Sequence, residues 1–228
     1  MQTVPSILEK NPQDLFFQIN RLSKYFSRFQ IDIADGIFVP NKTVQIDDVF
    51  KFFESKDFMN FITLQTLKTL SFDFHLMVSD FKTDISKLNN LKKIINIQHI
   101  FIHFSVISDF GFRISDLSPI PIGLTLNPED QVDDLTSHYN LKQIPSIQIM
   151  SVVPGVQGNP FLPSTLKKIE LLRLLGYRNK IFLDGAVNDK TLPIINKLKF
   201  KPDIICPGSY LTKTKTLKKN VEYLNKLT

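Results

Sequence analysis

Residues 28–35 read RFQIDIAD and residues 72–78 read FDFHLMV. In both stretches apolar residues occupy every second position, which is typical of a strand whose two faces meet different surroundings. Short runs rich in β-branched or aromatic residues recur along the chain and alternate with stretches of helical spacing. This alternation predicts parallel strands joined by helices.

Eight strands of this kind can be assigned. They cover residues 4–8, 28–35, 72–78, 99–104, 122–126, 146–152, 180–185 and 202–206. Eight regular units favour closure into a (β/α)8 barrel, or TIM barrel, over the alternative of an open doubly wound sheet. The length of 228 residues fits one such barrel, which typically needs about 200 to 250 residues. We therefore expect a single barrel domain over residues 1–228.

Helices are predicted from apolar spacing and from residues that favour helix ends. Asn11 and Pro12 mark the start of the first helix, and Pro163 and Gly176 bracket a later one. Further helices are expected near 47–56, 84–95, 129–139, 189–199 and 213–227, with an extra segment at 57–71. Residues 105–118 contain Gly111 and are followed at once by Pro119, so a helix there is expected to be short or distorted.

The composition is that of an ordinary globular chain, with 43% hydrophobic and 22% charged residues. No apolar run approaches the roughly 18 residues that a membrane span needs, and the start of the chain does not resemble a signal peptide. We therefore expect a cytoplasmic protein without membrane contact. The single cysteine, Cys206, excludes an internal disulfide and Cys-rich zinc motifs.

The formal net charge is +6. The lysines are spread along the chain, which indicates solvated helix faces more than a binding patch. The other interpretation is attraction of small anionic molecules. Nucleic acid is not expected, because no aromatic-basic patch or known nucleic-acid motif is present.

Polar residues fall on the inner face of the predicted barrel. In strand 28–35 the apolar Phe29, Ile31 and Ile33 must face the helices, which turns Gln30 and Asp32 inward. The same alternation turns His75 and Asp184 inward. Each alone could be a hydrogen-bonded core group. Together they converge near the carboxyl ends of strands, where barrel active sites are built, and buried carboxylates are costly unless they are paired or metal-bound.

Glycines supply a second signal. Gly155 and Gly158 follow the sixth strand, Gly185 ends the seventh, and Gly208 follows the eighth. Glycines in such loops let backbone N–H groups approach a phosphate closely, although a single one would indicate only a tight turn. Because three adjacent loops carry them, and Ser209 adds a hydroxyl, we expect a phosphate to bind there.

Segments spread over nearly the whole chain resemble the ribulose-phosphate 3-epimerases. They are PSIL (5–8), IDIADGIFVPN (31–41), DFHLMV (73–78), MSVVPGVQGNPF (150–161), LDGAVN (183–188) and CPGSYL (206–211). LNPED (126–130) and the NPF ending (159–161) also resemble the allulose-6-phosphate 3-epimerases. The resemblance implies an isomerase of carbohydrate metabolism that inverts C3 of a ketose phosphate. Ribulose 5-phosphate of the pentose phosphate pathway, giving xylulose 5-phosphate, is the family default, and a hexulose 6-phosphate such as allulose 6-phosphate is the alternative.

The family works with two aspartates, one as base and one as acid, and with a divalent metal, Zn, Fe, Mn or Mg, that polarises the carbonyl. Its metal ligands are His, Asp, His and Asp. The resemblance carries the catalytic aspartates over to Asp32 and Asp184, the second histidine to His75, and the first histidine to Gln30. An amide oxygen is a weaker ligand than imidazole for zinc or iron. Gln30 is therefore either a weak fourth ligand or only a hydrogen-bonding group.

The resemblance also implies substrate contacts. They fall on Ser6, Met77, Met150, Gly155, Gly158, Gly185, Ala186, Gly208 and Ser209. The chain departs from the family pattern at Ala34, Val153, Gln157 and Ala186 as well as at Gln30. These departures motivate an alternative function, a catalytically weak epimerase-like barrel that binds a sugar phosphate or a protein partner.

The remaining histidines, His99, His103 and His138, fall on no family motif that carries chemistry. We expect them to be structural or solvated, and we expect Cys206 to be a small buried apolar residue. Barrels of this family often associate, so the resemblance is compatible with a homo-oligomer.

Overall fold

A computed structural model describes residues 1–55, 63–107 and 113–227. Its strands are parallel and belong to one sheet, in which each strand from β2 to β8 pairs with the next along the chain and β1 pairs with β9. The strands are β1 (Gln2–Thr3), β2 (Ser6–Ile7), β3 (Arg28–Ala34), β4 (Ser71–Met77), β5 (Asn96–His103), β6 (Ile122–Leu126), β7 (Ser146–Met150), β8 (Lys180–Asp184) and β9 (Ile204–Cys206).

The sheet closes on itself through the first residues of the chain. β1 pairs with β9, and β2 pairs with β3. Between them, the Val4 N–H donates to the Ile205 carbonyl at 3.0 Å, while the Pro5 carbonyl accepts from the Gln30 N–H at 2.8 Å. Proline has no N–H to donate, and two short strands on either side of Val4 and Pro5 take the place of the single strand predicted at 4–8. Together these segments occupy one barrel position, and the predicted (β/α)8 barrel is confirmed.

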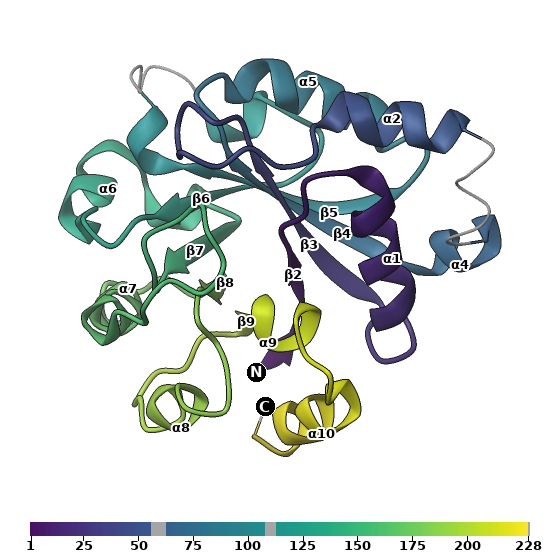
Figure 1. Ribbon diagram of the computed structural model, residues 1–228. Coiled ribbons are helices and arrows are strands. Elements are labelled where there is room, and N and C mark those ends of the chain that lie inside the picture. Colours follow the sequence, from purple (N-terminus) through teal and green to yellow (C-terminus); the bar gives the residue numbers. More distant parts are fainter. Residues whose placement is uncertain (56–62, 108–112, 228) are drawn as a thin grey trace.

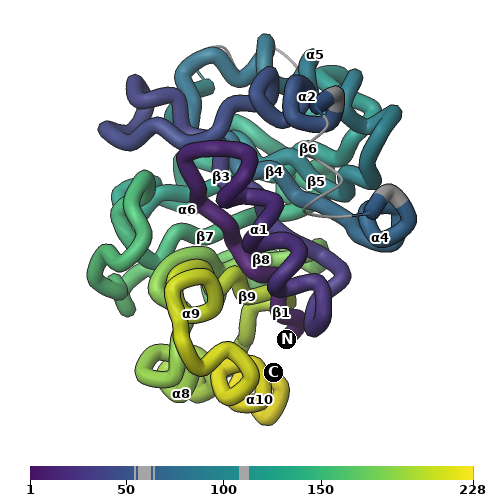
Figure 2. The backbone as a smooth tube through the Cα atoms, turned by 45° about the vertical axis from the view of Figure 1, so that its right-hand side comes forward, coloured from purple at the N-terminus to yellow at the C-terminus, as the bar shows by residue number. Residues whose placement is uncertain are grey.

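Helices surround the barrel. Figure 1 shows the strands at the centre, with helices around them, and Figures 1 and 2 both place the N-terminus beside the C-terminal helix α10. The helices are α1 (Pro12–Leu22), α2 (Ile46–Glu54), α4 (Leu64–Thr69), α5 (Phe81–Leu91), α6 (Val132–His138), α7 (Lys167–Leu174), α8 (Leu192–Ile195), α9 (Ser209–Thr212) and α10 (Leu217–Leu227). None of the helices in the described ranges is both long and apolar enough to cross a bilayer.

Helix boundaries differ from the predicted ones where a capping side chain sets the start. α5 begins at Phe81, before the predicted residue 84, because the Asp80 side chain accepts from the Thr83 N–H. α8 starts later than the predicted 189, because the Asn188 side chain accepts from the N–H groups of Lys190 and Thr191 and holds a turn there. Such local hydrogen bonds compete with helical ones.

Two predicted segments lie partly outside the described residues. Of the extra segment at 57–71, the structure describes α4 and the start of β4 but not residues 56–62. Of the distorted segment at 105–118, it describes short 3₁₀ turns at Phe104–Val106 and Ile114–Asp116 but not residues 108–112.

The core has an outer and an inner part. The outer part lies between the strands and the helices and includes Phe29, Ile33 and Leu76, at the helix-facing positions predicted from alternation. The inner part fills the barrel itself, and Phe101 and Phe182 meet there edge to face with ring centroids 4.7 Å apart. The packed interior leaves the carboxyl ends of the strands as the place for a site.

An ion pair closes the amino-terminal end of the barrel. The Arg28 guanidinium donates two hydrogen bonds of 2.8 Å to the fully buried Asp73 carboxylate. His99 Nδ1 accepts a third bond from Arg28, also at 2.8 Å. The guanidinium stacks over Phe182, 5.5 Å from its centroid. The predicted structural role of His99 matches this arrangement.

We expect Arg28→Met to lower the free energy of unfolding by about 3 kcal/mol, because it leaves the Asp73 carboxylate buried without its cation. The measurement is urea denaturation at pH 7. The matched control is Lys87→Met, which removes the Lys87–Asp47 ion pair from the surface and should cost less than about 1 kcal/mol. Equal losses in the two variants would contradict the expectation.

Candidate active site

Strand register brings three ionisable side chains into one layer of the barrel. Asp32 on β3 and His75 on β4 are direct register partners. Asp184 ends β8 and is in register with Met150 on one side and Cys206 on the other. All three ionisable residues are buried, with at most 6% of their surface exposed. The inward orientation predicted from alternation is therefore what the structure shows for these residues.

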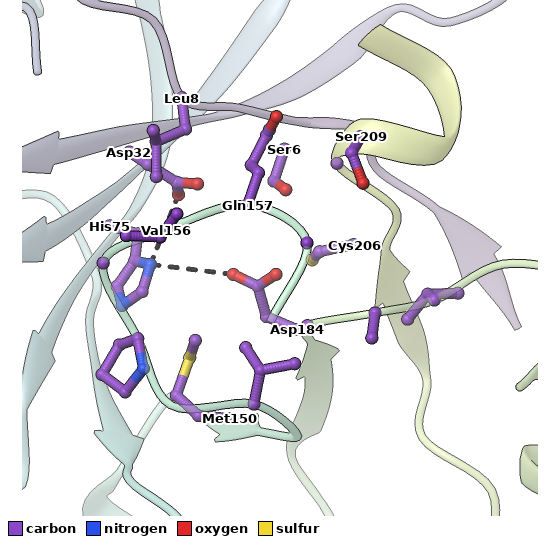
Figure 3. A pocket seen from close by; sticks show the side chains of 18 of the residues that line it. Ser6, Leu8, Asp32, His75, Met150, Val156, Gln157, Asp184, Cys206 and Ser209 are labelled. Carbon is purple, nitrogen blue, oxygen red and sulfur yellow. Dashed lines mark hydrogen bonds and ion pairs between the residues drawn. The ribbon is translucent and has the colours of Figure 1, made fainter. Parts of the chain in front are cut away.

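The imidazole lies against both carboxylates. His75 Nδ1 is 3.3 Å from Asp32 Oδ1 and 3.7 Å from Asp184 Oδ2 (Figure 3). One ligand atom from each residue lies within 4.8 Å of the other two. Carboxylate oxygen and imidazole nitrogen are common ligands of divalent metals. Two carboxylates buried together also repel each other unless a cation or a proton offsets their charge. The donor set therefore fits a divalent cation.

Gln30 lies beneath this group and is fully buried. Its Nε2 donates to Asp184 Oδ2 at 2.6 Å and to Asp32 Oδ1 at 3.2 Å. Its Oε1 accepts from the Cys206 thiol at 3.6 Å. The amide nitrogen, and not the oxygen, thus faces the carboxylates. Of the two roles predicted for Gln30, the structure shows the hydrogen-bonding one.

Gln148 is a second buried amide at the same carboxylate. Its Nε2 donates to Asp184 Oδ2 at 3.1 Å. Gln148 was not among the residues predicted for the site, although the pattern of its strand points to it. Ile147 and Ile149 face the helices, so alternation turns Gln148 inward.

Burial, and after it the charge of Asp32, raise the pKa of Asp184 to about 7, although His75 and the hydrogen bond from Gln30 act in the opposite direction. Asp184 is therefore partly protonated near neutral pH when no cation is bound. A carboxyl group of this kind can both donate and accept a proton at physiological pH.

His103, which was expected to be structural or solvated, is buried and contacts the site. Its Nε2 lies 2.9 Å from His75 Nε2. Its ring sits between those of His75 and Phe38, at centroid distances of 4.9 and 4.6 Å. Burial lowers the pKa of His103, and the charge of His75 lowers it further, while the Asn127 side chain acts in the opposite direction. Alternation in IFIHF could have shown that His103 points inward.

A cavity of about 190 Å³ opens above these groups. Its lining includes twelve of the thirteen residues expected at the site, and Gln30 lies beneath it. The twelve are Ser6, Asp32, His75, Met77, Met150, Gly155, Gly158, Asp184, Gly185, Ala186, Gly208 and Ser209. Figure 3 shows Ser6, Gln157 and Ser209 together on the side of the cavity away from His75.

The backbone at this side is tightly fitted. A Cβ on Gly208 would lie 2.9 Å from both Ser6 Oγ and Gln157 Nε2. Gly185 has φ 112°, and a Cβ there would lie 2.6 Å from Val152. Ala186 keeps a positive φ of 49° without being glycine. The chain therefore comes close to the cavity through its backbone, as anion binding by N–H groups requires.

Comparison with known proteins agrees with this geometry. A model described as the ribulose-phosphate 3 epimerase family matches residues 2–211. A ribulose-phosphate 3-epimerase of Methanocaldococcus jannaschii is 30% identical over 174 residues, which cover 74% of this chain and 66% of that protein. One from Helicobacter pylori is 28% identical over 234 residues, which cover 98% and 96% of the two chains. The solved structure of a mutant tryptophan synthase alpha-subunit from Pyrococcus furiosus superposes with a TM-score of 0.67 at 10% identity, over 99% of this chain and 97% of that one, which shows the fold alone.

The raised pKa of Asp184 predicts a pH-dependent stability of the metal-free protein. The folded state binds this proton more tightly than the unfolded state. The destabilisation caused by burying the ionised Asp184 carboxylate is therefore absent below pH about 4, grows up to pH about 7, and is complete above it. The quantity to follow is the Tm of the wild type minus the Tm of Asp184→Asn, with both proteins kept metal-free by a chelator. We expect this difference to fall by about 5 °C between pH 4 and pH 8. Calorimetry measures the difference. Added Zn²⁺ should raise the Tm of the wild type at pH 8, and a pH-independent difference would contradict the assignment.

Proposed function

The chain belongs to the ribulose-phosphate 3-epimerase family, and from this premise we propose that it inverts the configuration at C3 of a ketose phosphate. The observation that carries the proposal is the pair of buried carboxylates, Asp32 and Asp184, which face one cavity from strands that are not neighbours in the sheet. Inversion at a carbon next to a carbonyl needs a proton removed from one face and another delivered to the opposite face.

In this proposal one aspartate removes the C3 proton and the other supplies a proton to the opposite face. In one direction Asp184 acts as the acid and Asp32 acts as the base. The roles exchange in the reverse direction, since the reaction is symmetric about an enediolate. Met77 and Met150 line the same cavity and keep water from the reacting carbon, which protects an enediolate from side reactions.

Asp32, His75 and Asp184 would hold the divalent cation, Zn, Fe, Mn or Mg, and Gln30 would orient both carboxylates by donating to them. When bound, such a cation stabilises the negative charge that develops on the carbonyl oxygen. Gln148 adds a further donor to Asp184, so that carboxylate keeps one orientation during the proton transfer.

The phosphate would bind at the opposite side of the cavity. Backbone N–H groups around Gly158, Gly185–Ala186 and Gly208–Ser209 supply donors there, and Ser6 adds a hydroxyl. Ribulose 5-phosphate is the first substrate to test and allulose 6-phosphate the second. The pentose phosphate setting, the cytoplasmic location and a homo-oligomeric state stay predictions.

One observation favours a second candidate, a barrel that binds a sugar phosphate or a protein partner with little or no turnover. The Gln30 amide already bridges the two carboxylates, and it replaces the imidazole that the family uses as a metal ligand. A weakened metal site would lower activity. The second candidate predicts sugar phosphate binding without exchange of the C3 proton.

The experiment that tests the proposal follows solvent deuterium into C3 and measures the conversion of ribulose 5-phosphate and allulose 6-phosphate. It is run with Zn²⁺, Mn²⁺, Fe²⁺ or Mg²⁺ and without metal. We expect metal-dependent turnover, and we expect Asp32→Asn and Asp184→Asn each to lower kcat about 10²- to 10⁴-fold, the usual contribution of a positioned acid or base.

Asp80→Asn is the matched control, because Asp80 caps α5 at the surface and Asn caps helices equally well. Its kcat should equal that of the wild type. Wild-type protein that binds the sugar phosphate but exchanges no C3 proton with any metal would rule out the epimerase and leave the binding barrel.

The phosphate side gives a separate prediction. Gly208→Ala should raise KM about tenfold, the loss expected for one hydrogen bond to a charged group, while kcat stays close to wild type. The alanine Cβ would meet Ser6 Oγ and Gln157 Nε2, both 2.9 Å away. Steady-state kinetics measure the change. Gln157→Ala in the Gly208→Ala background removes one of these obstructions and should recover part of the affinity, whereas an unchanged KM in Gly208→Ala would move the phosphate elsewhere.

A further inference from the structure

We propose that His103 and Asn127 are positioning residues that hold His75 in the tautomer with its proton on Nε2, so that its Nδ1 is free to bind the cation. The three residues form the His75–His103–Asn127 relay. The inference rests on the proposed function in one respect, since it takes Nδ1 of His75 as the atom that faces the metal.

The two nitrogens of His75 have different surroundings. Nδ1 faces Asp32 and Asp184, and Nε2 faces His103 Nε2 at 2.9 Å. A neutral imidazole carries one proton, on one nitrogen or the other. Coordination through Nδ1 needs the lone pair there, which places the proton on Nε2. In the other tautomer, Nδ1–H donates to Asp32 and no nitrogen lone pair faces the carboxylates.

The short contact between the two imidazoles can hold only one proton. If His75 donates through Nε2, His103 must accept through its own Nε2, and its proton then sits on Nδ1. His103 is fully buried and its ring is enclosed by those of His75 and Phe38. The tautomer of His75 therefore depends on whether His103 Nδ1 has a hydrogen-bond acceptor for its proton.

On the side of His103 away from His75, two buried polar atoms could be joined by one hydrogen bond. Within the described residues, His103 Nδ1 and Asn127 Oδ1 are both buried without a hydrogen-bond partner. His103 is in register with Thr125, two residues before Asn127, and Asn127 is bonded to Ser105, two residues after His103. A proton on His103 Nδ1 would satisfy both atoms. Unsatisfied buried groups cost about 1 to 3 kcal/mol each, so this arrangement is favoured.

Asn127 is fixed so that its oxygen is the free atom. Its Nδ2 donates to Ser105 Oγ at 3.0 Å. Its backbone N–H donates to Asp130 Oδ2 at 2.7 Å, and its carbonyl accepts from the Lys168 ammonium. The residue, at the end of β6, thus holds its position from three sides. The direction of the relay then runs from His75 through His103 to Asn127.

The relay matters more in this chain than in one with two imidazoles at the metal. Gln30 offers no imidazole, and among the described residues that could hold the ion together, His75 supplies the nitrogen and the aspartates supply oxygens. The tautomer of one ring decides whether that nitrogen is available.

The first test reads the tautomers directly. The chain has 4 histidines, so two-bond ¹H–¹⁵N spectra of the metal-free protein can be assigned by single substitutions. We expect the His75 proton on Nε2 and the His103 proton on Nδ1. A wild-type protein with the His75 proton on Nδ1 would overturn the proposal.

The second test removes the acceptor. Asn127→Leu keeps the shape of the side chain and removes its oxygen, so we expect His75 to shift towards Nδ1–H and the Kd for Zn²⁺, measured by chelator competition, to rise about 10- to 100-fold. Asn127→Asp keeps an acceptor and should retain the Nε2–H tautomer and bind Zn²⁺ at least as tightly as the wild type. The matched control is Thr125→Val, which removes the unpaired buried hydroxyl of Thr125 on β6 and should leave both readouts unchanged.

An Asn127→Leu variant that folds, by circular dichroism, and keeps both the tautomer and the Zn²⁺ affinity would overturn the proposal. Failure of the proposed function looks different. If the wild type shows Nε2–H on His75 but binds no Zn²⁺ or Mn²⁺, the relay stands and the metal-assisted part of the proposed function falls.

Discussion

Two carboxylates share a buried space at the carboxyl ends of β3 and β8, and much of the barrel interior can be understood as compensation for that. Asp32 and Asp184 would repel each other in a medium of low polarity. Gln30 and Gln148 donate to them, and His75 lies against both. The two amides stabilise the carboxylates but leave their negative charge in place, so the site can still take up a proton or a cation.

The two ends of the barrel differ in whether a buried carboxylate has a positively charged side chain as its partner. At the amino-terminal end, Asp73 receives a complete partner in Arg28, and the pair is closed to ligands. At the carboxyl end, none of the described residues that line the cavity is Lys or Arg. The acidic centre and the proposed phosphate position thus lack side-chain cations, so a metal ion and backbone N–H groups would be the natural counter-charges. The difference between the ends follows from where each aspartate falls along its strand.

The replacement of an imidazole by Gln30 changes how the centre is held together. An amide bridges the carboxylates by donating hydrogen bonds, whereas an imidazole ligand would contact the metal itself. His75 would then supply the nitrogen ligand of the proposed metal group, and the orientation of its ring would depend on its neighbour His103. Sequence motifs drew attention to Gln30, but they did not distinguish its nitrogen from its oxygen. That distinction depends on Cys206, which lies next to Gln30 only after the sheet has closed.

The sequence by itself determined the eight-unit barrel and the inward direction of Asp32, His75 and Asp184, because alternation along a strand and capping at helix ends are local properties of neighbouring residues. The same local rule would have found His103 and Gln148, had it been applied to β5 and β7. Only the tertiary structure decided which inward groups meet. The split at Pro5, the amide direction of Gln30 and the facing of His103 with His75 and Asn127 all depend on register and closure between strands, which bring together atoms far apart in the chain.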